Sequence, residues 1–238
     1  MRRPVHRLIR RLLAIVTVSL VLLLVGSAGA VLAWRWLDPV TTSFILQRKV
    51  SEALAGGNAR DVEFRWVDAE SISEHMAIAV IASEDQRFRE HWGFDLDSIE
   101  DALEEREAGG RVRGASTISQ QVAKNLLLWP GRSWLRKGLE AYLTLLVEAF
   151  WPKERILEVY LNIAQFGDKT FGVGAASERF FGKRASELGP REAALLAAVL
   201  PNPVGLRADD PSAYVQSRVR WIRRQMQRLG GPAYMHGI

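Results

Sequence analysis

Two adjacent carboxylates, Glu84 and Asp85, follow an apolar stretch of the chain. The stretch, residues 76–82, predicts a buried helix, and an acid at the end of a core segment is costly unless it is paired. If the helix continues, Glu84, Phe88 and His91 occupy positions i, i+4 and i+7 and share one face. This segment therefore groups a carboxylate, an aromatic ring and an imidazole, although an ordinary helix end with charge pairs explains the same residues.

A second polar group follows about 30 residues later, where a helix is predicted to begin at a serine cap. Its polar side chains, counted from that cap, are Ser116, Thr117, Gln120, Gln121, Lys124 and Asn125. No acid occurs from residue 111 to residue 139, whereas a solvated helix face usually mixes Lys with Glu. The stripe therefore offers hydrogen-bond donors and a cation to a ligand, with a solvated polar face as the alternative.

Acidic and basic residues are segregated along the chain. Residues 68–107 contain 13 acids and 3 arginines, and residues 111–155 contain 8 basic residues and 3 acids. An acidic lobe that faces a basic lobe suits a substrate with a hydroxyl to deprotonate at one end and an anionic leaving group at the other. Glu140, one turn after Arg136 and Lys137, is either their ion-pair partner or a second active-site carboxylate.

The elements that must position these groups are predicted mostly as helices. One short strand is expected at 62–66, where Val62, Phe64 and Trp66 alternate with charged residues. Helices are expected over 43–54, 74–88, 96–107, 116–126, 139–150, 153–162, 190–200 and 211–229. The arginines of the last helix are interpreted mostly as a solvated face, with contact to anionic lipid as the alternative. The fold class is therefore mainly α.

The N-terminus predicts a membrane anchor. Residues 12–34 carry no charge, and as a helix they extend about 34 Å, enough for a hydrocarbon core of about 30 Å. Five arginines precede this run and only Arg35 follows closely, which predicts a cytoplasmic N-terminus and a domain on the outer side. Residues 28–30 resemble a small-residue cleavage site, so a cleaved signal peptide is the alternative, although the apolar run exceeds the usual signal core.

Four segments are expected: a basic tail at 1–11, the anchor at 12–36, a juxtamembrane segment at 37–60 and one domain at 61–238. Five of the 32 basic residues lie in the tail, so the remaining 27 balance the 27 acids and no nucleic-acid-binding surface is indicated. The chain has no cysteine, which excludes disulfides and cysteine-ligated metals. No phosphate-binding glycine motif, no His pair at metal spacing and no Gly-x-Ser-x-Gly elbow occurs.

Several motifs in order resemble those of one enzyme family. They are Glu84-Asp85-x-x-Phe88-x-x-His91-x-Gly93-x-Asp95, Gly114-Ala115-Ser116-Thr117-Ile118-Ser119-Gln120-Gln121-x-x-Lys124-Asn125, Arg136-Lys137-x-x-Glu140 and Ile156-Leu157-Glu158-x-Tyr160-Leu161-Asn162. Together they resemble the peptidoglycan glycosyltransferase family, glycosyltransferase family 51, over about residues 60–205. The similarity is greatest to monofunctional members, since neither Ser-x-x-Lys nor Lys-Thr-Gly of a transpeptidase domain occurs.

The resemblance implies a lysozyme-like helical fold behind the single transmembrane helix. Its substrates would be lipid II, a disaccharide-pentapeptide on undecaprenyl pyrophosphate, and the growing glycan chain. The expected location is the cytoplasmic (inner) membrane, with membrane lipids and other cell-wall synthesis or division proteins as further partners. No cofactor is expected to be required and no protein metal site is indicated, although a divalent cation, Mg²⁺ or Mn²⁺, could join the pyrophosphate.

The resemblance also assigns roles to residues. Glu84 would be the base that deprotonates the GlcNAc 4-hydroxyl, and Glu140 would be the family's second catalytic glutamate. Lys124, Arg136 and Lys137 would bind the pyrophosphates. The other substrate-binding residues would be Asp85, Phe88, His91, Ser116, Thr117, Gln120, Gln121 and Asn125. A lytic enzyme of lysozyme-like fold and a non-catalytic membrane scaffold are the two alternatives.

Overall fold

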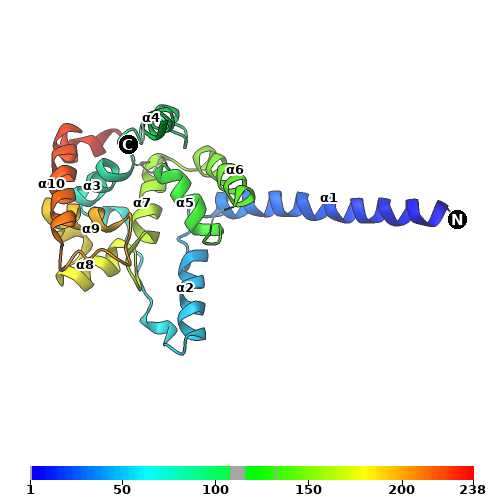
Figure 1. Cartoon of the computed structure of the whole chain (residues 1–238), viewed down its shortest axis with the longest axis horizontal. Coiled ribbons are helices and arrows are strands. Elements are labelled where there is room, and N and C mark those ends of the chain that lie inside the picture. Colours follow the sequence, from blue (N-terminus) through cyan, green and yellow to red (C-terminus); the bar gives the residue numbers. More distant parts are fainter. Residues whose placement is uncertain (1, 108–115, 132) are drawn as a thin grey trace.

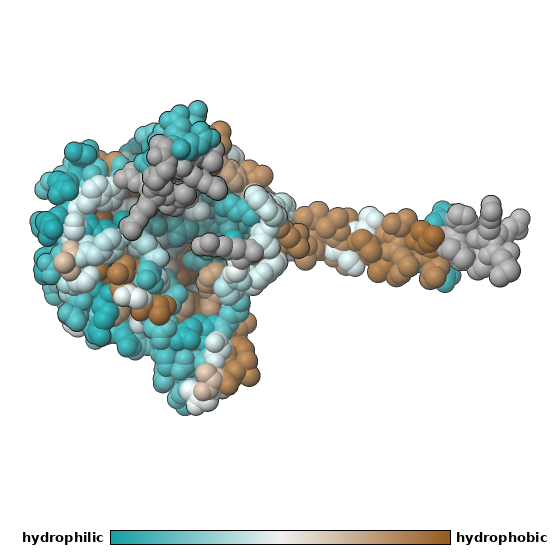
Figure 2. Space-filling model, viewed as in Figure 1, coloured by the Kyte–Doolittle hydropathy of each residue, from teal (hydrophilic) through white to brown (hydrophobic). Residues whose placement is uncertain are grey.

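The computed structural model describes residues 2–107, 116–131 and 133–238. Helix α1 (Arg2–Ala33) projects from one end of a domain formed by the following residues (Figure 1). Its segment Leu8–Ala33 is the one helix within these ranges that is long and apolar enough to cross a membrane, a criterion that a signal sequence also meets. Apolar side chains cover most of this helix, whereas the domain surface in the same view is largely hydrophilic (Figure 2).

The domain is mainly helical, as the sequence predicts. Its core is centred on α3 (Glu74–Glu84), which packs against α9 (Pro190–Val199) and α10 (Ala213–Arg228). Because the apolar residues of α3 cover all its sides, residues 76–82 are buried throughout. A second group consists of α5 (Ile118–Leu127), which contacts both α6 (Trp134–Phe150) and α7 (Lys153–Ile163). The candidate catalytic residues lie on these two groups of helices.

Smaller elements complete the domain. They are α2 (Ser43–Leu54), α4 (Leu96–Glu107), α8 (Val173–Phe181) and the 3₁₀ helices η1 (Ala59–Asp61), η2 (Ala69–Ser71), η3 (Ala185–Glu187) and η4 (Gly231–Gly237). The sheet has strand order β1 (Glu63–Phe64), β3 (Thr170–Phe171), β2 (Gln165–Gly167), with β1 parallel and β2 antiparallel to β3. The predicted strand at 62–66 is therefore present but shorter. The predicted basic loop at 109–114 lies outside the described residues.

The predicted continuation of α3 to residue 88 is wrong. The helix ends at Glu84 because Asp85 takes a non-helical conformation, with φ −161° and ψ 74°. The Asp85 carboxylate instead accepts a hydrogen bond from the backbone N–H of Ile118, 2.9 Å away, and lies 2.8 Å from Nε2 of His91. Phe88 and His91 therefore do not share a helix face with Glu84, and Phe88 is fully buried.

The loop between Asp85 and α4 is packed tightly onto neighbouring helices. Gly93 has φ +77°, a left-handed conformation that glycine tolerates best. Its backbone oxygen accepts a hydrogen bond from the Thr117 hydroxyl at 2.6 Å. A Cβ atom at Gly93 would lie 2.6 Å from Cγ2 of Thr144. Both backbone conformation and close packing thus require a glycine here.

Helix α5 begins one residue later than predicted, and Ser116 is not its cap. Thr117 is the N-cap, and its hydroxyl accepts a hydrogen bond from the backbone N–H of Gln120 at 3.2 Å. The Gln120 side chain in turn accepts from the Thr117 N–H at 3.0 Å. This reciprocal pair is a capping box, and the Thr117 hydroxyl also donates to the backbone oxygen of Gly93, as described above.

The domain end of α1 is docked on α6 and α7. The Trp151 indole donates to the backbone oxygen of Val31 at 2.7 Å, and the Tyr142 hydroxyl donates to that of Leu24 at 3.1 Å. Arg155 of α7 donates to the backbone oxygen of Trp34, within 2.9 Å. These contacts satisfy backbone oxygens near the end of α1 and join the helix to the domain.

Replacing Gly93 with alanine is expected to lower the free energy of unfolding by about 2–4 kcal/mol, since it adds both a strained backbone and an overlap with Thr144. Gly138→Ala is the matched control. Gly138 lies within α6 with no atom within 4 Å of the position that a Cβ would occupy, so helix propensity should raise stability by about 0.5–1 kcal/mol. Urea unfolding in detergent micelles measures both variants. A Gly93→Ala protein as stable as the parent would contradict the packing described for this loop.

Candidate active site

Glu84 lies at the C-terminal end of α3, where only 14% of its side chain is exposed. Its Oε2 accepts a hydrogen bond from the Gln121 amide on α5 at 3.1 Å. The guanidinium of Arg218 on α10 lies 4.0 Å from Oε1 of Glu84, and the Ser83 hydroxyl is 3.4 Å from the same oxygen. Three helices thus converge on this carboxylate.

Burial raises the pKa of Glu84 above its ordinary value. Hydrogen bonds from Gln121 and Ser83 and the charge of Arg218 oppose this rise, while the neighbouring Asp85 charge adds to it. A general base works best when its pKa approaches the pH at which the enzyme operates. Its environment therefore suits Glu84 to accept a proton from a substrate hydroxyl.

Tyr160 of α7 supports the orientation of Gln121. Its hydroxyl is 3.4 Å from the Gln121 side-chain oxygen. Burial keeps the pKa of Tyr160 well above its ordinary value, so the hydroxyl stays protonated and can donate. With its oxygen turned to Tyr160, Gln121 presents its amide N–H to Glu84.

A basic cluster lies near Glu84 and consists of Lys124 on α5 with Arg136, Lys137 and Glu140 on α6. Nη1 of Arg136 is 2.9 Å from Oε2 of Glu140, and Nζ of Lys137 is 2.5 Å from Oε1. Burial lowers the pKa of Lys124, where the Glu140 charge opposes the shift and the Arg136 and Lys137 charges reinforce it. Two of these cations form ion pairs with Glu140 and Lys124 lies within reach of its charge, which leaves an excess of positive charge for an anionic ligand.

Two features leave the basic cluster with hydrogen-bond donors that a ligand can use. The Nε atom of Arg136 is buried without a hydrogen-bond partner among the described residues. The Lys137 side chain remains 45% exposed, whereas the Glu140 side chain is 4% exposed. Arg136 and Lys137 are thus held by the buried Glu140 carboxylate, and both can still donate hydrogen bonds to phosphate oxygens.

Other predicted site residues have structural partners in this fold. Asp85 and His91 bond to each other, Phe88 is buried in the core, and Thr117 and Gln120 form the capping box. Their contact with substrate remains a prediction. Ser116 is exposed at the start of α5, and Asn125 is partly buried one residue after Lys124. Asn125 therefore adjoins the basic cluster through Lys124, whereas Ser116 lies at the opposite end of α5 from Lys124.

A buried group that the sequence analysis did not single out lies beneath the loop between Asp85 and α4. The Glu148 carboxylate accepts a hydrogen bond from Ser119 and lies 2.8 Å from Nζ of Lys153. The same Nζ donates to the backbone oxygen of His91 at 2.7 Å and lies over the Phe88 ring. In the sequence, Glu148 is the single acid in the otherwise apolar second half of α6, and this was the available indication of a buried ion pair. The solvated-face interpretation of the last helix is wrong for Arg218, which faces Glu84.

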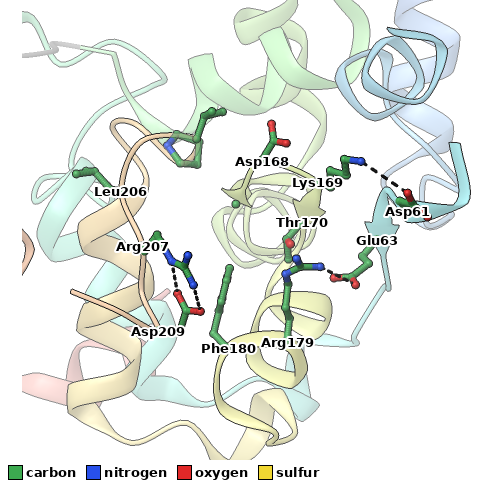
Figure 3. Close-up of a pocket in the computed structure, with 13 residues that line it drawn as sticks. Asp61, Glu63, Asp168, Lys169, Thr170, Arg179, Phe180, Leu206, Arg207 and Asp209 are labelled. Atoms are coloured by element: carbon green, nitrogen blue, oxygen red, sulfur yellow. Dashed lines mark hydrogen bonds and ion pairs between the residues drawn. The ribbon is translucent and has the colours of Figure 1, made fainter. Parts of the chain in front are cut away.

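A cavity of about 600 Å³ lies elsewhere, between the sheet and the loop that follows α9. Figure 3 shows its ion pairs, in which Arg179 meets Glu63 and Arg207 meets Asp209. None of the predicted site residues lines it. In the described part of the chain, no three His, Cys, Asp or Glu side chains gather as a metal site.

Comparisons with known proteins agree with the motifs. Residues 49–227 match the profile of a family described as Transglycosylase. A biosynthetic peptidoglycan transglycosylase of Pseudomonas entomophila (strain L48) is 55% identical over 210 residues, 88% of this chain and 89% of the relative. The protein of that name from Pseudomonas putida (strain KT2440) is 53% identical over 228 residues, 96% of this chain and 94% of the relative. A third, from Pseudomonas syringae pv. syringae (strain B728a), is 51% identical over 213 residues, 90% of each chain.

Neutralising the two glutamates should affect stability in opposite directions. The raised pKa of Glu84 means that its ionised form is disfavoured in the fold, so stability is lost as pH rises through that pKa. Glu84→Gln should therefore raise the melting temperature at neutral pH, with the gain vanishing below the ordinary pKa of 4.5. Glu140→Gln leaves Arg136 and Lys137 without their carboxylate and should cost about 2–4 kcal/mol. Calorimetry at several pH values measures the stability of both variants. A Glu84→Gln protein that is less stable than the parent at neutral pH would contradict the raised pKa of Glu84.

Proposed function

Because the chain belongs to the peptidoglycan transglycosylase family, we propose that it polymerises lipid II into glycan strands. The growing chain would pass from undecaprenyl pyrophosphate to the GlcNAc 4-hydroxyl of lipid II, forming a β-1,4 linkage. The observation that carries this proposal is that a buried carboxylate, Glu84, lies close to the basic cluster on α5 and α6 without an ion pair to it. Its mainly helical, lysozyme-like fold agrees with the family.

The proton step rests on Glu84. The acceptor 4-hydroxyl loses its proton to this carboxylate as the oxygen attacks the anomeric carbon of the terminal MurNAc. The bond from that carbon to the pyrophosphate oxygen breaks, and the α-linked donor becomes a β-linked product. This is a single displacement with inversion, so no glycosyl-enzyme intermediate forms. Gln121 and Arg218 hold Glu84 in place through the contacts described above.

The leaving-group step rests on the basic cluster. Pyrophosphate departs as an anion and needs positive charge more than it needs a proton donor. Lys124, Arg136 and Lys137 supply that charge, and Glu140 fixes the geometry of the last two. We propose that no resident metal is required, and that a Mg²⁺ or Mn²⁺ ion, where one takes part, arrives with the pyrophosphate.

The same features weigh against the two alternatives. A lytic enzyme of this fold needs an acid for a neutral sugar leaving group and has no use for three cations beside the glutamate. A non-catalytic scaffold has no need for a buried carboxylate whose pKa is raised. The arrangement of Glu84 with Lys124 and Arg136 therefore favours synthesis.

Membrane attachment brings the site to a lipid-linked substrate. We propose that α1 stays as a single-pass anchor with its N-terminus in the cytoplasm and the domain outside the inner membrane. The helix from Leu12 to Leu24, where Tyr142 makes contact, spans only about 20 Å, short of a hydrocarbon core of about 30 Å. Docking at Leu24 would therefore draw α6 toward the lipid. Cleavage near Ala30 would remove that contact, which favours retention.

Incubation of the full chain with purified lipid II, followed by separation of the products, tests the function. Polymeric glycan is the expected product. Degradation of preformed glycan without polymer would indicate the lytic enzyme, and no change in either substrate would indicate the scaffold. Addition of a chelator in a parallel reaction shows whether a divalent cation takes part, and loss of activity would contradict metal independence.

Removing a cation from the basic cluster should weaken phosphate binding and leave the fold intact. Lys124→Ala or Arg136→Ala is expected to reduce affinity for lipid II and for phosphoglycolipid inhibitors of the moenomycin type by about tenfold or more. Arg184→Ala is the control, because Arg184 is exposed and its ion-pair partner among the described residues is nearby Glu187. Isothermal titration in detergent gives the affinities. Unchanged affinity in both cluster variants would remove them from the site.

The anchor should remain on the mature protein. We expect the N-terminus to be intact and the protein to stay with membranes after a carbonate wash, because α1 is long enough to span and is docked on α6. Mass spectrometry of the purified protein reads the N-terminus directly. A soluble product that begins near Val31 would contradict the anchor and support the signal peptide.

A further inference from the structure

Helix α10 carries an arginine stripe on its outer face, formed by Arg220, Arg223, Arg224 and Arg228. All four side chains are exposed, and α10 contains no acidic residue. None of the four has a carboxylate oxygen within 4.0 Å among the residues that the structure describes. From Arg220 to Arg228 the stripe extends about 12 Å along the helix.

Some exposed arginines elsewhere, among them Arg60, Arg89 and Arg191, also lack a carboxylate within 4.0 Å among the described residues, but they do not gather on one helix face. Four others, which pair with a carboxylate, are Arg65, Arg179, Arg184 and Arg207. Like charges on one helix face repel each other, so four unpaired cations cost stability unless an anion occupies the face. The arginine stripe therefore has the character of a binding surface for a polyanion.

The position of α10 argues against membrane lipid as that anion. Helix α10 lies at the end of the domain opposite to α1 (Figure 1), so the stripe is far from where the anchor enters the bilayer. The surface at that edge is hydrophilic (Figure 2). Electrostatic attraction to anionic lipid falls off within a Debye length of about 10 Å. The width of the domain between α10 and α1 is greater than this length. The interpretation of these arginines as a lipid contact is therefore not supported.

The same helix forms one wall of the candidate active site. Its apolar residues Val215, Val219 and Ile222 are buried in the core, which fixes how the helix is rotated. Arg218 then faces Glu84, two residues before the stripe begins at Arg220. A polymer that leaves the site across α10, away from the membrane, would meet the arginine stripe.

We propose that the arginine stripe binds the carboxylates of peptide stems on the nascent glycan strand and so retains the strand during elongation. This inference rests on the proposed function, because that reaction makes a strand with an acidic peptide on each disaccharide. Arginine suits the task, since its planar guanidinium donates two parallel hydrogen bonds to one carboxylate. Several such contacts on one strand reinforce each other, so retention does not need a deep pocket.

The test compares the full chain with a variant in which all four stripe arginines are glutamine. We expect the variant to bind uncrosslinked strands with intact pentapeptide stems about tenfold more weakly at low salt and to release shorter products. Its rate of joining two lipid II molecules should be unchanged. A variant with four lysines should restore most of the binding, and strands stripped of stems by an amidase should bind both proteins equally.

Controls separate this proposal from its premise. Glutamine at Arg65, Arg184 and Arg207 removes three exposed charges elsewhere and should leave product length unchanged. Equal strand binding and product length in the stripe variant and the parent would overturn the proposal. An acidic protein would then be the remaining candidate ligand of the arginine stripe. A difference that persists on stem-free strands would also overturn it. If the parent protein makes no polymer, the proposed function itself fails.

Discussion

The carboxylate of Asp85 is the contact on which the site geometry depends. It is almost fully buried, yet it accepts the first backbone N–H of α5 and bonds to His91. A carboxylate at a helix N-terminus is stabilised by the unpaired N–H groups and the helix dipole there. Asp85 ends α3 and also accepts the backbone N–H of the first residue of α5, so it fixes Glu84 on one helix relative to Gln121 and Lys124 on the other.

This arrangement explains how one small domain can hold the proposed base, Glu84, close to the basic cluster without forming an ion pair between them. Glu84 receives a neutral amide donor and only a distant guanidinium, so burial dominates and its proton affinity rises. Glu140 receives two cations at direct ion-pair distance and serves to hold them. Two chemically identical side chains thus have different electrostatic environments because of their partners.

The sequence predicted most of the helices and the residues that gather around Glu84 and Glu140, because apolar periodicity and motif spacing are local. The premature end of α3 was not predictable in that way, since its cause is a hydrogen bond to Ile118, 33 residues away. Arg218 was likewise hidden, because its helix looks like a solvated basic face until α10 is packed against α3. The observed N-cap of α5, Thr117, is one residue from the predicted cap, Ser116, which is within the usual uncertainty of helix boundaries.

Glu84 is the proposed general base, and Glu84→Gln tests this role most directly. Glutamine keeps the shape and the hydrogen bond to Gln121 but cannot accept a proton at working pH. We predict normal lipid II binding with a fall in polymerisation rate of about 10²–10⁴-fold or more. Glu70→Gln, at an exposed position, should behave as wild type. Polymerisation by Glu84→Gln within a few-fold of wild type would contradict the account and direct attention to Glu140 or Asp85.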